Sequence, residues 1–286
     1  MDQLLVVGIS VLNSIAVLVI VSIGLAVIFG MMKIINLAHG EFIMLGAYGV
    51  LTLSRLHINI WFCIALSSLI VGLFGLVIER LLIRFLYKRP LDTLLATLGL
   101  SLVLAQAVVL VYGPTTSGVA EPLGHVQMGR YSASQYQLLL IVVACLLLTA
   151  VYALFARTRY GVMARAVVQN PQMASAIGID SGRTNMVTFA VGSGLAGAAG
   201  ALLAPIAGVV PSMGQAYVAQ AFMTVIVGGQ GVLLGTSAAS ALLGTTYSAT
   251  SYVFTPFLGQ SALLVVAIVL VRVRPQGLSA RWRTLL

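Results

Sequence analysis

Residues 136–156 read YQLLLIVVACLLLTAVYALFA, a stretch without a single charged side chain. The hydrocarbon core of a bilayer is about 30 Å thick, and a helix needs about 20 apolar residues to cross it. Two further runs of this kind occupy residues 3–32 and 93–112. Because all three runs are continuous rather than alternating, they predict membrane-spanning helices and not strands.

The composition extends this interpretation to the whole chain. Of 286 residues, 60% are hydrophobic and 7% are charged, and the mean hydropathy is +1.09. A soluble core cannot bury so much apolar surface, so the predicted fold class is all-α, a polytopic transmembrane helical bundle. Cys63 and Cys145 both lie in apolar runs and offer neither a disulfide framework nor metal-ligand spacing, so no cofactor or metal is expected.

The basic residues set the orientation. The net charge is +9, and most of the positive charge gathers in three short segments between apolar runs. These groups are Arg80, Arg84, Lys88 and Arg89; Arg157, Arg159, Arg165 and Arg183; and Arg272, Arg274, Arg281 and Arg283. Basic residues in short loops mark the cytoplasmic side, so we place all three groups inside and expect no nucleic-acid partner.

The spans then follow from the alternation of sides. The first five are expected near residues 4–29, 41–54, 59–79, 94–111 and 137–155, with an outer loop at 113–136. Four more spans are expected between Arg183 and Arg272, with breaks near 205–211, 228–231 and Pro256. This gives about nine spans with the N-terminus outside. The number is eight if the short segment 34–48 is broken or re-entrant.

Polar residues stand among apolar ones at Asn36-Leu37-Ala38-His39-Gly40-Glu41. Ionisable groups at membrane depth are costly and suggest function. One hypothesis is a proton relay by His39 and Glu41, although a spacing of two directs side chains to different faces of a helix. The other is a helix break favoured by Asn36 and Gly40, with Asn36 or His39 starting a half-helix and Glu41 in its first turn, where transporters place substrate or gating contacts.

Small residues fill Gly192–Gly200, with Ser193 and Gly197, and Ala196 and Gly200, each four apart. This spacing is typical of close helix packing in membranes. No nucleotide or catalytic site accompanies it. The segment Gly231–Ser237 resembles a phosphate loop but lacks the lysine, and the histidines and carboxylates form no catalytic cluster beyond His39 and Glu41, so the chain is not expected to be an enzyme.

The cytoplasmic segment 157–183 contains two short helical patterns. The first ends before Pro171, and the second, Met173–Gly178, ends in a glycine. Such pieces either lie on the membrane surface or dock into a groove of another subunit.

Several motifs resemble the first permease subunit of the branched-chain amino acid ABC importers and their urea and short-chain amide relatives. They are Ile35–Phe42 followed by Gly46-Ala47-Tyr48, Arg89–Thr97, Ala174–Ile179 and Val225–Gly231. The likeness covers essentially the whole chain. Arg89–Thr97 and Met213–Tyr217 look closer to the urea and amide members, so urea or a short-chain amide is the favoured substrate and a branched-chain amino acid the next.

The resemblance implies an inner-membrane, multi-pass permease domain spanning residues 1–286, with a coupling loop at 157–183. It also implies a second related permease, with a heterodimer favoured, two cytoplasmic ATPase subunits that hydrolyse ATP, and an extracytoplasmic solute-binding protein, in contact with membrane lipid. The competing hypothesis is a stand-alone proton-coupled secondary transporter or channel.

The candidate residues form two groups. Those for the substrate pathway or gate are Asn36, His39, Gly40, Glu41, Gln106 and Gln215. Those that the resemblance assigns to coupling with the ATPases are Gly161, Arg165, Asn170 and Gly178. For Gln106 and Gln215, a hydrogen bond between helices is an equal alternative.

Overall fold

The computed structural model describes residues 2–87, 89–128, 131–229, 231 and 233–279. Three residues named above, Lys88, Arg281 and Arg283, lie outside these ranges. Helices dominate the described residues, and the predicted helical bundle is confirmed.

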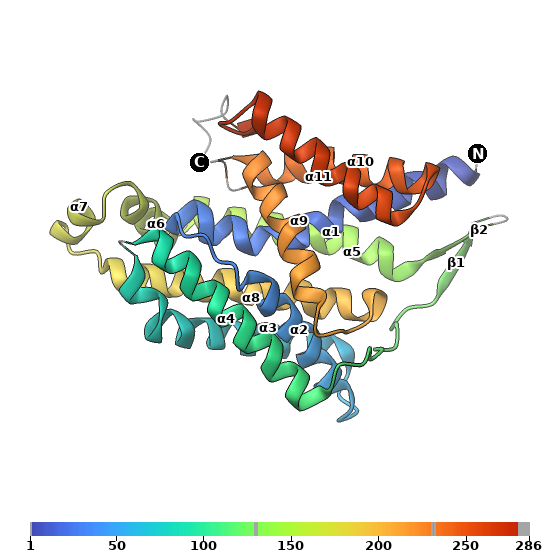
Figure 1. The fold of residues 1–286 in the computed structure, drawn as a ribbon, viewed down its shortest axis with the longest axis horizontal. Coiled ribbons are helices and arrows are strands. Elements are labelled where there is room, and N and C mark those ends of the chain that lie inside the picture. The colour runs from blue at the N-terminus through green and yellow to red at the C-terminus, as the bar shows by residue number, and fades with distance from the viewer. Residues whose placement is uncertain (1, 88, 129–130, 230, 232, 280–286) are drawn as a thin grey trace. The chain divides into compact units, whose positions relative to one another are not determined.

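Nine helices of 16 or more residues follow the expected order along the described residues (Figure 1). They are α1 (Asp2–Met32), α2 (His39–Ser54), α3 (Ile60–Leu81), α4 (Pro90–Tyr112), α5 (Gln135–Arg157), α8 (Ser181–Ala207), α9 (Met213–Gly228), α10 (Leu234–Val253) and α11 (Pro256–Val273). Six of them, α1, α3, α4, α5, α8 and α11, are long and apolar enough to cross a membrane. The expected breaks fall at glycine and proline: α8 ends before Gly208, α9 ends at Gly228 and α11 begins at Pro256.

Helices α2 and α9 are shorter than the others. Each has 16 residues, or about 24 Å at 1.5 Å per residue, which is less than the hydrocarbon thickness. For α2 this agrees with the expectation of a broken or re-entrant segment.

The smaller elements lie between these helices. A 3-10 helix, η1 (Ile83–Leu86), follows α3, and two short helices, α6 (Arg159–Gln169) and α7 (Pro171–Ala176), follow α5. The outer loop contains an antiparallel hairpin that the sequence analysis did not predict, with β1 (His125–Met128) paired to β2 (Tyr131–Ser134) so that His125 lies opposite Ser134.

The chain divides into two compact units. Unit 1 comprises Met1–Ser22, Ala120–Ala150 and Gln220–Leu286, and unit 2 comprises Ile23–Val119 and Val151–Ala219. In unit 1, α10 contacts α11. A buried cluster there is formed by Leu18, Val227, Ala239, Leu243, Leu263 and Ala267.

Unit 2 is organised around α8, which contacts both α2 and α3 (Figure 1). The small residues of α8 make these contacts close, as their spacing predicted. A methyl group on Gly46 of α2 would lie 2.7 Å from the Cα of Gly197, and one on Gly197 would lie 2.6 Å from the Cβ of Val71 of α3. Hydroxyl groups reinforce the interface, because Ser67 donates to the Gly46 carbonyl at 2.7 Å and Ser68 donates to the Gly194 carbonyl at 2.8 Å. Small residues thus allow the backbones of these helices to approach each other closely.

Candidate functional site

The polar segment lies where the chain leaves one helix and starts the next. Lys33 adopts a left-handed backbone conformation, with φ of 56°, directly after α1. Asn36 Oδ1 accepts a hydrogen bond from the Ala38 amide at 3.1 Å and closes a turn before α2. As expected, α2 then begins at His39 with Glu41 in its first turn, and both residues are buried. Asn36 is not the cap of α2, because the cap position belongs to Ala38.

Hydrogen bonds from α4 hold this segment in place. The Leu37 amide donates to Thr97 Oγ1 at 3.2 Å, and Ser101 Oγ donates to Glu41 Oε1 at 3.0 Å. Asn36 is 0% exposed and Glu41 is 1% exposed. Within the part of the chain that the structure describes, Asn36 Nδ2 and Glu41 Oε2 have no hydrogen-bond partner. A buried polar group without a partner costs about 1–3 kcal/mol, so this arrangement leaves one donor and one acceptor unsatisfied at a cost in stability.

The first turn of α9 lies against the first turn of α2. A methyl group on Gly214 would lie 2.8 Å from both Glu41 Oε2 and the Gly40 carbonyl oxygen, and one on Gly40 would lie 2.7 Å from the Gly214 carbonyl carbon. Only glycine permits an approach this close. Two helix N-termini therefore meet beside the Glu41 carboxylate, and their peptide dipoles favour negative charge at that point.

Four of the six candidate pathway residues are thus brought together: Asn36, His39, Gly40 and Glu41. The structure does not bring Gln106 or Gln215 into this group, and both residues are exposed on α4 and α9. Sequence reasoning did not single out Ser101 or Gly214, whose roles depend on which faces of α4 and α9 are turned toward α2.

The first part of the 157–183 segment, α6, is attached to the end of α5. Thr158 caps α6 by accepting a hydrogen bond from the Gly161 amide at 3.1 Å. Gly161 is buried directly against the Phe155 carbonyl. Arg165 donates from Nη1 to the same carbonyl oxygen. Gly161 and Arg165 therefore hold α6 against the last turn of α5.

Helix α6 is also joined to α8 through Tyr160. Its hydroxyl lies 2.6 Å from Thr188 Oγ1 and donates to the Thr184 carbonyl at 3.2 Å. Burial raises the pKa of the Tyr160 phenol, partly offset by the hydrogen bond with Thr188. The hydroxyl is therefore protonated at neutral pH and keeps the proton it donates.

The second part, α7, is a short helix of six residues, and all of them except Ala174 are exposed. Asn170 caps it by accepting hydrogen bonds from the Gln172 amide at 3.1 Å and the Met173 amide at 3.0 Å. Gly178 follows the helix with φ of 88°, a conformation suited to glycine. Two large apolar side chains are exposed here, Met173 at 63% and Ile177 at 70%. All four candidate coupling residues therefore shape or attach α6 and α7.

A family model described as "Branched-chain amino acid transport system / permease component" matches residues 8–273. The chain belongs to this permease family. The resemblance to the permeases of this ABC importer group is therefore confirmed, and the permease is a multi-pass protein of the inner membrane.

Curated relatives of the permease come from bacteria and an archaeon. It is 28% identical over 279 residues to the high-affinity branched-chain amino acid transport system permease protein BraD of Pseudomonas aeruginosa, covering 92% of this chain and 91% of the relative. It is 28% identical over 282 residues to LivH of Escherichia coli K12, with the same coverage. It is 26% identical over 293 residues to a probable LivH of Methanocaldococcus jannaschii, covering 94% and 90%. No solved structure matches the permease.

The preference for urea or a short-chain amide finds no support among these relatives, whose names specify branched-chain amino acids. That preference rested on Arg89–Thr97 and Met213–Tyr217. In the structure, Thr97 and Gly214 within these motifs contact the chain around α2. Residues that position a helix carry little information about which solute passes.

Proposed function

We propose that the permease forms half of the translocation pathway of an ABC importer for branched-chain amino acids. A related permease forms the other half, a binding protein delivers the solute from outside, and two cytoplasmic ATPase subunits supply the energy. The observation that carries the proposal is the family match over residues 8–273. Relatives named for branched-chain amino acid transport favour this substrate class.

In this proposal, the meeting point of α2 and α9 acts as the gate. A free amino acid carries an ammonium and a carboxylate group. When the first turns of α2 and α9 separate, Glu41 Oε2 accepts a hydrogen bond from the ammonium, and Asn36 Nδ2 donates one to the carboxylate. Both groups are buried without partners in the arrangement described above. The Gly40–Gly214 contact keeps the pathway closed between transport events.

The 157–183 segment transmits the movement of the ATPases. Met173 on α7 and Ile177 directly after it offer an apolar contact surface. The attachment of α6 passes a displacement to both neighbouring helices. Arg165 connects it to α5, and Tyr160 connects it to α8. A change at the cytoplasmic surface thereby reaches the helix that packs against α2.

The test is uptake of labelled leucine, urea and acetamide by proteoliposomes that contain the permease, its co-purifying subunits and the binding protein. We expect leucine uptake that requires ATP. Preferential uptake of urea or acetamide would contradict the substrate class. Uptake without ATP or partner subunits would contradict the importer and favour the proton-coupled secondary transporter.

Tyr160→Phe tests the coupling route. Removing the hydroxyl deletes the contacts with Thr188 and Thr184, a loss of about 1 kcal/mol for each hydrogen bond. We expect ATP hydrolysis to continue while the number of solutes taken up per ATP falls. Tyr152→Phe on α5, an exposed tyrosine, is the matched control and should leave this ratio unchanged. An unaltered ratio in Tyr160→Phe would remove Tyr160 from the route.

A further inference from the structure

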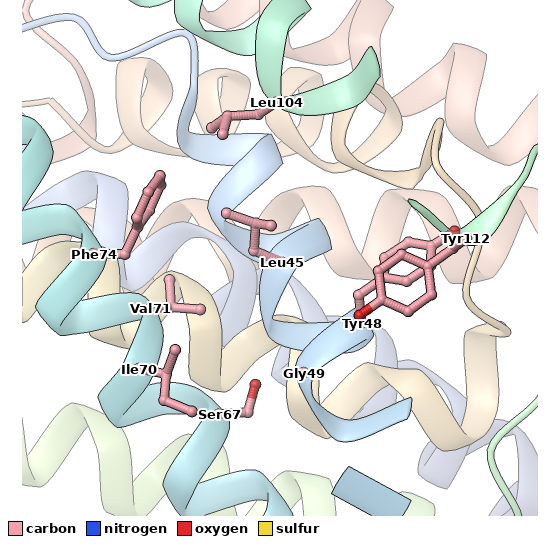
Figure 2. A pocket seen from close by; sticks show the side chains of 9 residues that line it. All are labelled: Leu45, Tyr48, Gly49, Ser67, Ile70, Val71, Phe74, Leu104 and Tyr112. Carbon is pink, nitrogen blue, oxygen red and sulfur yellow. The ribbon is translucent and has the colours of Figure 1, made fainter. Parts of the chain in front are cut away.

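Unit 2 contains a cavity of about 330 Å³ between α2, α3 and α4 (Figure 2). Leu45 of α2 faces Val71 and Phe74 of α3 across it, and Leu104 of α4 closes another side. At one end, the ring centroids of Tyr48 and Tyr112 lie 4.7 Å apart. The cavity is more than twice as large as the roughly 150 Å³ space that holds benzene in an engineered protein core.

The cavity lies between the hydrogen bonds that join α2 to α4. Within the described part of the chain, three hydrogen bonds join α4 to α2 or to the turn before it, and in each the partners are 60 residues apart in the sequence. Two involve Leu37 and Glu41, at the start of α2, and the third joins Thr52 to Tyr112 at 2.7 Å near its end. Leu45, Tyr48 and Leu104, which line the cavity, fall between these ties. Between these ties, Val108 of α4 also belongs to the same buried cluster as Met44 and Tyr48 of α2. The cavity lies beside that cluster.

The chemistry of the lining favours hydrocarbon. Among the described residues that line the cavity, none is charged. The Ser67 hydroxyl is committed to the Gly46 carbonyl, and that of Tyr112 is paired with Thr52. An amino acid would need charged partners for its ammonium and carboxylate groups, and the described lining offers none. Transferring these two charges to such a site is strongly unfavourable.

The cavity reaches the exposed face of α3 at Ile70. Ile70 both lines the cavity and is 51% exposed. Its neighbours on this face, Leu69 and Leu73, are also large and exposed. In membrane proteins, small residues form the contacts between helices, and α3 uses its small residues, Ser67 and Gly75, toward α2 and α8. The large aliphatic face is therefore the one that meets the bilayer.

We propose that an acyl chain of a membrane phospholipid enters this cavity beside Ile70 and packs between α2 and α4. The chain fills the space that the three hydrogen bonds leave open and supports the middle of α2. Because α2 carries Glu41 in its first turn, the lipid stabilises the helix that forms the proposed gate. The site itself does not depend on which solute is transported.

Photo-labelling tests this site directly. The permease with its co-purifying subunits is placed in vesicles of phosphatidylethanolamine and phosphatidylglycerol that contain a phosphatidylcholine with a diazirine near the end of one acyl chain. Tyr48 is 2% exposed, so lipid can reach it only through the cavity. We expect labelled peptides that contain Leu45 or Tyr48, in addition to peptides from the exposed face of α3.

Two tryptophan variants on α4 give the control. Leu104→Trp fills the cavity and should abolish labelling at Leu45 and Tyr48, whereas Leu102→Trp, at an exposed position on the same helix, should preserve it. Leu104→Phe, a smaller change, should reduce the labelling even if the tryptophan variant fails to fold. Label confined to exposed residues, label at Tyr48 that persists in both Leu104 variants, or protection of Tyr48 by leucine would each overturn the proposal.

Discussion

Glu41→Gln is expected to reduce leucine uptake by about tenfold to a hundredfold, the range that follows from losing a hydrogen bond to a charged group at about 1.5–3 kcal/mol. Glutamine keeps the volume and can still accept a hydrogen bond from Ser101, so the fold is retained. What is lost is the carboxyl group that the proposed gate offers to an ammonium group. The measurement is ATP-dependent uptake in proteoliposomes at equal amounts of assembled complex.

Two further variants separate charge from structure. Ser101→Ala removes the donor to Glu41 Oε1 but keeps the carboxylate, so we expect a smaller loss of uptake. Glu121→Gln removes a carboxylate that accepts a hydrogen bond from Ser134 in the loop between α4 and α5. This variant should leave the rate of leucine uptake unchanged. Normal uptake by Glu41→Gln would exclude the carboxylate from the gate.

Gly46→Ala is expected to destabilise the permease by about 1–3 kcal/mol, the usual cost of adding a methyl group to a filled interface. The new methyl would lie 2.7 Å from both the Cα and the carbonyl carbon of Gly197, so α2 and α8 must move apart. Thermal unfolding of the detergent-purified complex measures the effect as a lower midpoint temperature.

The matched control is Gly99→Ala on α4. A methyl group on Gly99 meets nothing within 4 Å, and alanine is favoured over glycine inside a helix by roughly 0.5–1 kcal/mol. The two variants are therefore expected to shift the midpoint in opposite directions. Equal midpoints would mean that the contact between α2 and α8 is not close.

Much of the fold was predictable, because uninterrupted apolar runs define spans and because glycine and proline define their ends. The helix break before His39 was predictable for the same reason, since Asn36 and Gly40 disfavour a continuous helix. The β1–β2 hairpin was missed because two strands of four residues carry too short a pattern to stand out within a polar loop.

The candidate site was only partly predictable. Ser101 and Gly214 contact Glu41 or lie beside it through the packing of helices that are far apart in sequence, and no local pattern reveals which face of a helix is turned inward. Gln106 and Gln215 illustrate the same limit. They stood out as polar residues in apolar runs, yet the rotation of α4 and α9 leaves both exposed.

The interface of α8 with α2 and α3 has a mechanical consequence. Where helices meet through glycine backbones and short hydroxyl side chains, few rotatable bonds lie between them, so a displacement cannot be absorbed by changes of rotamer. An axial shift of α8 that begins at Thr184 and Thr188 would therefore reach Gly46 with little attenuation. Such an interface favours sliding of whole helices over local rearrangement, and each added methyl group would raise the steric barrier to that sliding.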